Sequence, residues 1–331
     1  MNSTKLQCAP IIIPTLCRYE HLKKCVESLG KSKLAKYTKL YISVDYPPSE
    51  KYVEGCEAVK RYVKNEINGF EEVVYFIQDT NLGPLGNERF LINEVYKRYD
   101  CYIFTEDDNV FSPAAIEYWN KGLQRFEKDP DIIAICAKAF AKYNREEEEP
   151  IFRLQSFSGY GFATWKSKET EYRSKITKDM CFKIIQDKKK FHKVYEGNRG
   201  PLYGLLSIAL EKEAVHFDRE GNLGCTDFAI TLYMIYYNKY AIYPRRFLTK
   251  NNGYDGTGVN CKEKVPNERV LDERTEFDMQ TAGYPKEEKV IKGDKWPWRI
   301  KRLPMVAEAF LIRHFGTGYY RYIKKIVGSR R

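Results

Sequence analysis

Short apolar runs alternate with helix-period segments along the first 140 residues. The apolar runs predict buried strands at 10–16 (PIIIPTL), 39–45 (KLYISVD), 72–79 (EVVYFIQD), 101–108 (CYIFTEDD) and 131–137 (DIIAICA). The segments between them predict helices at 19–30, 49–68, 87–99 and 112–126. The first helix would bury Leu22, Cys25, Val26 and Leu29 on one face, and the last would have Ser112 as its N-cap with Pro113 at its first position. This order predicts an α/β fold with a mainly parallel central sheet flanked by helices.

The pattern is less regular after residue 140. Helices are expected at 178–187, 202–215 and 227–238, and one more strand at 240–248. Two segments lack a clear period. A charged, solvated loop is expected at 144–150 (NREEEEP), and glycine alternates with aromatic residues at 156–165 (SFSGYGFATW). The second half therefore predicts an irregular, mainly helical region beside the sheet.

Composition limits the class of protein. A chain of 331 residues with 43% hydrophobic residues is long enough to bury a sizeable core. Its nine cysteines are odd in number and never spaced as CxxC, so neither a disulfide framework nor a zinc site is indicated, and a reducing compartment is expected. Since no apolar run is long enough for a signal peptide or a membrane span, we expect a cytoplasmic protein.

Three adjacent acids, Glu106, Asp107 and Asp108, follow the fourth predicted strand. In open parallel sheets, ligands bind outside the carboxyl ends of the strands, which is where this cluster would lie. Adjacent carboxylates repel one another, and Mg²⁺ or Mn²⁺ shared with substrate phosphates would relieve that repulsion. The alternative is that the acids only offset the dipole of the following helix.

The segment TEDDNVFSPAAIEYW (105–119) resembles the metal-binding region of GT-A glycosyltransferases, and most closely the inverting N-acetylglucosaminyltransferase I group, whose motif is EDD. PTLCRYEHLKKCVESL (14–29) and YISVD (41–45) are similar to the first and second strands of that group with their flanking residues. The resemblance implies that Asp108 ligates the metal and that Glu106 and Asp107 contact the sugar and ribose. It also implies that Arg18 contacts the nucleotide and that Asp45 hydrogen-bonds the uracil. Alternatively, Arg18 pairs with a neighbouring acid and Asp45 starts an ordinary turn.

Inverting transfer requires a base that accepts the proton of the acceptor hydroxyl. The resemblance implies an aspartate at a helix start after the glycine-aromatic loop, and Asp227 fits that place, with Phe228, Leu232 and Ile235 expected to face the core. The alternative is an acid that only complements the helix dipole. Asp218 and Asp255 are the next candidates, and Thr226 stands where the family has a tryptophan. We expect structural or surface roles for His21, His192, His216 and His314.

The resemblance implies a catalytic domain over 1–258, with a nucleotide-sugar-binding half at 1–140 and an acceptor half at 141–258, followed by a C-terminal extension at 259–331. It implies transfer from a nucleoside-diphosphate sugar, UDP-linked and of the UDP-GlcNAc type, to a saccharide or lipid-linked acceptor in bacterial surface polysaccharide biosynthesis. Two alternatives are a sugar-1-phosphate nucleotidyltransferase, which would need a glycine-rich loop after the first strand, and a non-catalytic nucleotide-sugar-binding module.

The C-terminal tail carries most of the net charge of +11. From Lys289 onward the sequence contains twelve Lys and Arg and two acids, Asp294 and Glu308, which gives ten excess positive charges. Aromatic and basic residues are mixed in helical stretches that we expect to break at Pro304, Gly316 and Gly318, a composition that suits the headgroup region of an anionic membrane. We therefore expect peripheral contact with the inner face of the plasma membrane. The alternative is a helical pair packed on the catalytic domain, and no motif indicates a nucleic-acid partner.

Overall fold

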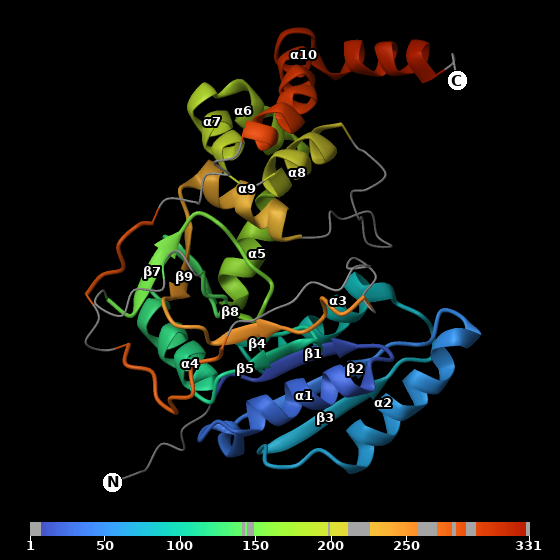
Figure 1. The fold of residues 1–331 in the computed structure, drawn as a ribbon, viewed down its shortest axis with the longest axis vertical. Helices are drawn as coiled ribbons and strands as arrows, with labels where there is room; N and C mark the ends of the chain where they lie inside the picture. Colours follow the sequence, from blue (N-terminus) through green and yellow to red (C-terminus); the bar gives the residue numbers. More distant parts are fainter. Residues whose placement is uncertain are drawn as a thin grey trace. The chain divides into compact units, whose positions relative to one another are not determined.

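The computed structural model describes residues 8–140, 143, 149–197, 199–210, 226–256, 270–279, 283–288 and 296–328. The chain forms two compact units. The first contains Met1–Arg153, Ser158–Glu169 and Ala241–Glu287, and the second contains Leu154–Phe157, Thr170–Tyr240 and Glu288–Arg331. Figure 1 shows the strands gathered in the first unit and a group of helices in the second.

An eight-stranded sheet forms the centre of the first unit, in the order β3-β2-β1-β4-β8-β6-β9-β7. Its strands are β1 (Ile11–Thr15), β2 (Lys39–Val44), β3 (Glu72–Ile77), β4 (Cys101–Phe104), β6 (Ile132–Cys136), β7 (Ile151–Leu154), β8 (Phe162–Trp165) and β9 (Tyr240–Pro244). Strands β3, β2, β1 and β4 are parallel, whereas β8 runs antiparallel to both β4 and β6. The predicted α/β class with a mainly parallel sheet is confirmed, as are the five strands predicted in the first half of the chain.

Strand β1 lies in the middle of the parallel strands and is buried on both faces. Ile11, Ile12 and Ile13 are fully buried, as expected for a strand of a parallel sheet that is covered on both sides. The carbonyls of Pro10 and Ile12 accept from N–H groups of β4 and of Thr105, so even-numbered residues of β1 face β4. Pro14 has the same orientation but no N–H, so the ladder between β1 and β4 cannot continue past it. The two strands separate at their carboxyl ends.

Helices cover both faces of this sheet. They are α1 (Tyr19–Gly30), α2 (Val53–Asn65), α3 (Gly83–Val95) and α4 (Ala115–Phe126), with short 3-10 turns η1 (Ala35–Tyr37) and η2 (Glu50–Tyr52). Because right-handed connections lead from β1 outward to β3 and then back to β4, α1 and α2 lie on one face and α3 on the other (Figure 1). The predicted core face of α1 is confirmed, since Leu22, Cys25, Val26 and Leu29 are all buried.

Several predicted boundaries were wrong. Helix α3 begins at Gly83 rather than at residue 87, because Pro84 lies in its first turn, where no N–H is needed for helix bonding. The strand predicted at 101–108 ends at Phe104. The chain turns there and forms β5 (Asn109–Phe111), which pairs antiparallel with β10 (Thr249–Asn251) in a two-stranded ribbon. Helix α4 therefore begins three residues after Ser112, and the strand predicted at 240–248 ends at Pro244.

The second unit is mainly helical. Its helices are α6 (Lys178–Gln186), α7 (Lys188–Glu196), α8 (Arg199–Ala209), α9 (Asp227–Tyr237) and α10 (Trp296–Gly328), and α5 (Lys166–Lys175) begins in the first unit and ends in the second. The helices predicted near 178, 202 and 227 are confirmed. The end of the second of these, like most of the predicted loop at 144–150, lies outside the described residues.

The C-terminal tail forms α10, which changes direction only at Gly316, where φ is +68°. The predicted breaks at Pro304 and Gly318 are wrong. Pro304 lies on the exposed side of the helix, where water can bond to the carbonyl that the missing N–H leaves without its helical partner. Within the described residues, no helix is both long enough and apolar enough to span a membrane.

Gly161 provides a test of how the start of β8 is packed. Its φ is +82°, and an added Cβ would lie 2.8 Å from the Phe111 ring and 2.9 Å from the Trp119 ring. We expect Gly161→Ala to lower the free energy of unfolding by about 2–4 kcal/mol, because backbone strain and overpacking add. Gly30→Ala is the matched control, since nothing lies within 4 Å of its added Cβ, and it should change stability by less than about 0.5 kcal/mol. Chemical denaturation measures both, and equal effects would contradict this account of the packing.

Candidate active site

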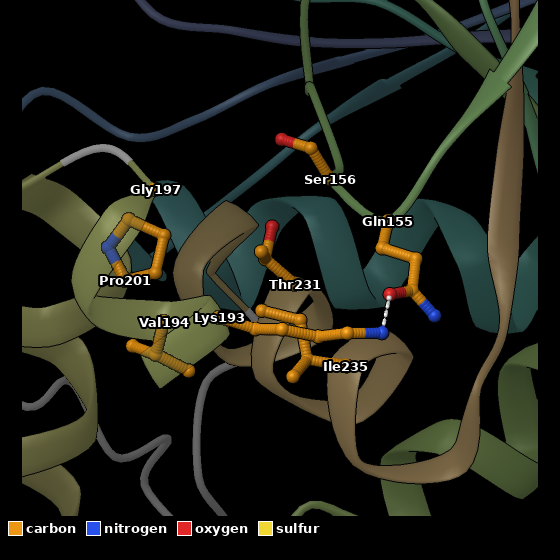
Figure 2. A pocket seen from close by; sticks show the side chains of 8 residues that line it. All are labelled: Gln155, Ser156, Lys193, Val194, Gly197, Pro201, Thr231 and Ile235. Atoms are coloured by element: carbon orange, nitrogen blue, oxygen red, sulfur yellow. Dashed lines mark hydrogen bonds between the residues drawn. The ribbon is translucent and has the colours of Figure 1, made fainter. Parts of the chain in front are cut away.

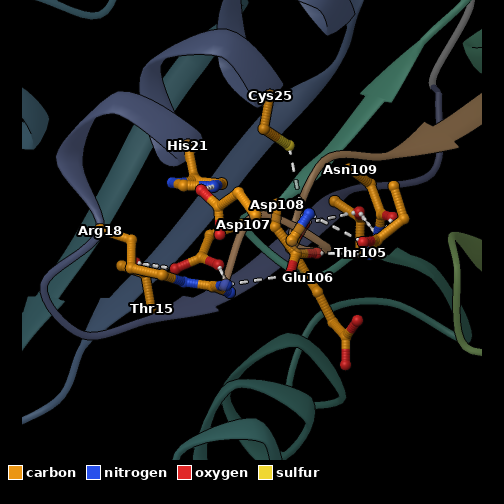
Figure 3. Close-up of polar contacts among 12 residues, drawn as sticks. Thr15, Arg18, His21, Cys25, Thr105, Glu106, Asp107, Asp108 and Asn109 are labelled. Atoms are coloured by element: carbon orange, nitrogen blue, oxygen red, sulfur yellow. Dashed lines mark hydrogen bonds and ion pairs between the residues drawn. The ribbon is translucent and has the colours of Figure 1, made fainter. Parts of the chain in front are cut away.

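The site lies outside the carboxyl ends of β1 and β4. From β1 the chain proceeds outward through β2 to β3 and then returns to the opposite side of β1 as β4. Such a reversal marks the usual ligand site of open α/β sheets, and we refer to this place at the carboxyl ends of β1 and β4 as the crevice. Thr15 ends β1 and Arg18 precedes α1, whereas Asp107 and Asp108 follow β4. The strand separation at Pro14 leaves room for these side chains to meet (Figure 3).

Asp107 and Asp108 are held by one arginine. The hydroxyl of Thr15 donates to Asp107 Oδ2 at 2.7 Å, and the Arg18 guanidinium donates to Asp107 Oδ1. A second guanidinium nitrogen lies 3.0 Å from Asp108 Oδ2. The two aspartates are only 5% and 9% exposed, while Glu106 is exposed and points away from Arg18 in Figure 3. Only two of the three adjacent acids therefore take part in the cluster, and the pairing of Arg18 with a neighbouring acid is present.

Burial and charge act in opposite directions in this cluster. Burial raises the pKa of Asp107, and the Arg18 charge and the Thr15 hydrogen bond only partly offset that effect. Burial alone would lower the pKa of Arg18, but the charges of Asp107 and Asp108 outweigh it, so the pKa of Arg18 is raised. Arg18 is therefore cationic at all physiological pH values.

The β5–β10 ribbon holds Asp108 from the other side. Asn251 Nδ2 donates to Asp108 Oδ1 at 2.8 Å and to Asn109 Oδ1 at 3.0 Å, and its own Oδ1 accepts from the Gly253 N–H at 2.8 Å. The Asn252 N–H donates to the Asp108 carbonyl at 2.8 Å. A Cβ at position 253 would overlap Asp108 Oδ2, so this close approach requires glycine.

Asp45 directly follows the last residue of β2, at the predicted strand end, and is buried. Its Oδ1 accepts from the N–H of Tyr46 at 2.9 Å and from the N–H of Leu82 at 2.8 Å, and Asn81 Nδ2 lies 3.3 Å from Oδ2. The carboxylate thus joins the end of β2 to the start of α3. It serves the local backbone in the way expected of an aspartate that begins a turn, and its predicted contact with uracil stays a prediction.

Two further contacts near the crevice were not predicted. His21 Nε2 lies 3.0 Å from Asp255 Oδ2, and His21 is in the first turn of α1, three residues after Arg18. Asp255 follows Gly253 in the same loop, and the hydroxyl of the intervening Tyr254 bonds to that of Tyr160. The spacing of His21 from Arg18 is a signal that could have drawn attention to this histidine, but its partner is too distant in the chain to be inferred.

Asp227 begins α9 in the second unit, as predicted, and is partly exposed. The hydroxyl of Thr226 caps this helix by accepting from the Ala229 N–H, and the Asp227 carbonyl accepts from Thr231 Oγ1 at 2.7 Å. The cluster of Arg18, Asp107 and Asp108 belongs wholly to the first unit. Asp218 and His216 lie outside the described residues.

The expected core face of α9 was only partly right. Leu232 and Ile235 are buried, but Phe228 is 41% exposed. Its ring lies against Gly200 and Gly204 of α8, where an added Cβ would overlap it. The Phe228 ring therefore packs on the surface of α8, over these two glycines, and does not enter the core.

The second unit also contains a small cavity near α9 (Figure 2). Its lining includes Gln155, Ser156, Lys193 and Thr231, and Lys193 Nζ donates to Gln155 Oε1 at 3.0 Å. Its volume of about 20 Å³ is enough for a water molecule and far too small for a nucleotide. This cavity is therefore not a substrate site.

Asp107 and Asp108 are the residues that could hold a divalent metal. Within the described part of the chain, no three His, Cys, Asp or Glu side chains form a complete metal site. Mg²⁺ and similar ions commonly use only one or two carboxylates and take their other ligands from water and substrate phosphates. Two carboxylates held close enough to share one guanidinium fit such a partial site, which a diphosphate would complete.

Comparison with models of known protein families found no match, and neither did comparison with curated proteins. Among solved structures, TarS from S. aureus in complex with UDP is 11% identical, with 72% of this chain and 60% of that chain covered and a TM-score of 0.39. The mannosyltransferase PcManGT from Pyrobaculum calidifontis, in complex with GDP-Man and Mn²⁺, is 12% identical, with coverages of 50% and 46% and a TM-score of 0.35.

The bifunctional enzyme WbbM is 11% identical, with 52% of this chain and 34% of that chain covered and a TM-score of 0.30. The chain thus spans less than two thirds of the length of each of these three structures. Similarity at this level does not assign an activity, so the function must be argued from the residues of the crevice.

Asn251 offers a direct test of the support around Asp108. In Asn251→Ala, two buried acceptors would lose a donor, so the free energy of unfolding should fall by about 2–4 kcal/mol. Asn252→Ala is the matched control, because it keeps the backbone N–H that bonds to Asp108, and it should change stability by less than about 0.5 kcal/mol. Equal losses in urea denaturation would show that the amide of Asn251 does not support the cluster.

Proposed function

We propose that the chain is a metal-dependent, inverting glycosyltransferase of the GT-A type. Its donor would be a nucleoside-diphosphate sugar, UDP-linked and of the UDP-GlcNAc type, and its acceptor a saccharide or a lipid-linked saccharide in bacterial surface polysaccharide biosynthesis. The observation that carries the proposal is the cluster of two buried carboxylates and a guanidinium at the separated carboxyl ends of β1 and β4. This place and this charge pattern suit a metal-bound diphosphate.

The residues of the crevice would bind and orient the donor. Asp108 would hold Mn²⁺ or Mg²⁺, which as a Lewis acid would stabilise charge on the departing diphosphate. Arg18 would donate to phosphate oxygens, and Asp45 would hydrogen-bond the uracil at the neighbouring strand end. The exposed carboxylate of Glu106 would contact the sugar, and Asp107 the ribose.

Asp227 would act as the general base. As the acceptor oxygen forms its bond to the anomeric carbon, the bond from that carbon to the diphosphate oxygen breaks, and the acceptor proton passes to the Asp227 carboxylate. Asp227 is partly exposed at the first turn of α9, so a carboxylate is available to solvent and to an acceptor there. Asp255, which is paired with His21, is the second candidate.

A sugar-1-phosphate nucleotidyltransferase is disfavoured by the connection from β1 to α1. That connection is only three residues long, Leu16 to Arg18, and contains no glycine. It therefore lacks the flexible, glycine-rich loop that would wrap a triphosphate. The following experiment distinguishes an enzyme from a non-catalytic module that binds the donor without turning it over.

Donor hydrolysis in the presence of Mn²⁺ tests the proposal. Asp108→Ala should lower the rate about 100-fold or more by removing a metal ligand, and Asp227→Ala about 100-fold by removing the base. Asp179→Ala is the matched control, because Asp179 is likewise a first-turn acid, of α6, and should retain full activity. If both site variants turn over like the parent, the proposed site is wrong. A parent that binds UDP but never hydrolyses a donor would be a binding module.

We further propose that α10 contacts an anionic membrane surface, which would suit a lipid-linked acceptor. The helix buries Arg302, Ala309 and Ile312 and contacts α6 and α8 within the second unit. Its other side presents Leu303, which is 61% exposed, and Phe310, which is 54% exposed and two turns further on. An apolar outer face within a tail that has ten excess positive charges matches the interface of an anionic bilayer.

Vesicle co-sedimentation tests this contact. The parent should bind phosphatidylglycerol vesicles more tightly than phosphatidylcholine vesicles, and Leu303→Glu with Phe310→Glu should weaken binding more than tenfold, since two apolar side chains would no longer be buried in lipid. Val270→Glu is the control, because Val270 is 78% exposed in the first unit. Unchanged binding of the double variant would show that α10 is not the contact surface.

A further inference from the structure

Arg18 bridges the two aspartates with two different nitrogens. One terminal nitrogen bonds to Asp107 Oδ1, and the other lies 3.0 Å from Asp108 Oδ2. The remaining oxygens are bonded to the protein, Asp107 Oδ2 to Thr15 and Asp108 Oδ1 to Asn251. The guanidinium therefore occupies the two oxygens that the protein framework does not use. A metal that is ligated by Asp108 would compete with the guanidinium for Asp108 Oδ2, and a metal ligated by both carboxylates would compete for both oxygens.

We propose that Arg18 is the resident cation of the acid pair and that it exchanges with the divalent metal. In the ligand-free protein the guanidinium holds Asp107 and Asp108 together, and it moves to the diphosphate when metal and nucleotide bind together. The inference rests on the proposed function, because it assigns the order of events in the same donor site. It predicts that the metal alone binds weakly and that the nucleotide strengthens metal binding.

Arg18 is the member of the cluster that is free to move. Its side chain is 26% exposed, against 6% for Asp107 and 11% for Asp108. It stands at the N-cap position of α1, where it makes no side-chain capping bond. The aspartates, in contrast, are fixed by Thr15, Asn251 and the close approach of Gly253. Rotation of the arginine side chain thus requires no change in the strands or in the ribbon.

The exchange makes metal and nucleotide binding cooperative. A metal that binds alone must displace the guanidinium, which then loses two charge-assisted hydrogen bonds and gains none from the protein at that place. When a diphosphate is present, its oxygens replace the carboxylates as acceptors, because guanidinium groups bind phosphate as well as carboxylate. The same free energy of coupling must then appear in the effect of the metal on nucleotide affinity.

Calorimetric titration of the full chain with Mn²⁺ alone tests the exchange. We expect Arg18→Gln to bind Mn²⁺ at least tenfold more tightly than the parent, because the competing cation is gone. Arg18→Lys retains one positive charge and should bind Mn²⁺ with an affinity closer to that of the parent. Arg61→Gln, an exposed arginine on α2, is the matched control and should leave the affinity unchanged.

A second arm adds UDP. In the parent, saturating UDP should raise the affinity for Mn²⁺ at least tenfold. In Arg18→Gln this enhancement should be several-fold smaller, and what remains comes from direct contact of the diphosphate with the metal. Since Arg18→Gln leaves two buried carboxylates without their cation, it is expected to melt at a lower temperature, and Mn²⁺ alone should raise its Tm more than that of the parent. The rise in Tm caused by Mn²⁺ can be measured even when the variant without metal melts at a lower temperature than the parent.

The outcomes separate the inference from the proposed function. If Arg18→Gln binds Mn²⁺ alone no more tightly than the parent, or if UDP strengthens Mn²⁺ binding equally in both, Arg18 is a fixed ion pair and the exchange is wrong. If UDP fails to bind at any Mn²⁺ concentration, the donor site itself is wrong, and the first arm still decides whether Arg18 and the metal compete. Absence of Mn²⁺ binding in both proteins would overturn both proposals.

Discussion

The mutual repulsion of Asp107 and Asp108 is the constraint on which the site depends. Both carboxylates are almost completely buried, and their bonds to Thr15, Arg18 and Asn251 hold them near one another. A buried charge that loses its partner destabilises a protein by about 3–5 kcal/mol, which is a large part of the total stability of a typical domain. A cation beside the ionised pair therefore stabilises the cluster. In the absence of ligand, that cation is Arg18.

Most of the surrounding framework keeps this charge pattern at one place. Pro14 ends the pairing of β1 with β4 and so opens the space into which Thr15 and Arg18 reach. The β5–β10 ribbon brings Asn251 to Asp108 across 143 positions of the chain. The ribbon also accounts for the late start of α4, since residues 109–111 form a strand before the helix can begin. The acids are thus held by the framework, whereas the arginine is the most exposed member of the cluster, and this arrangement would allow one cation to replace another.

Local patterns predicted the sheet and the position of the acids well, because strands that are buried on both faces have continuous apolar sequences. Contacts between distant residues were not predictable in the same way. Nothing near Asp108 indicates that Asn251 will bond to it, and nothing near His21 indicates Asp255. Predicted helix boundaries were wrong at prolines, because a proline can either end a helix or be accommodated within one. Pro84 begins a helix and Pro304 lies within one, whereas a sequence pattern alone favours a turn at both.

The proposed reaction is divided between the two units of the chain. The residues proposed to bind the metal, the diphosphate and the uracil belong to the first unit. Asp227, the proposed general base, and α10 belong to the second. Binding of UDP and metal should therefore depend on the first unit alone, while proton removal and contact with an acceptor at a membrane depend on the second. In keeping with such a division, the side chains of the described residues that bond to the carboxylates of Asp107 and Asp108 all belong to the first unit, namely Thr15, Arg18 and Asn251.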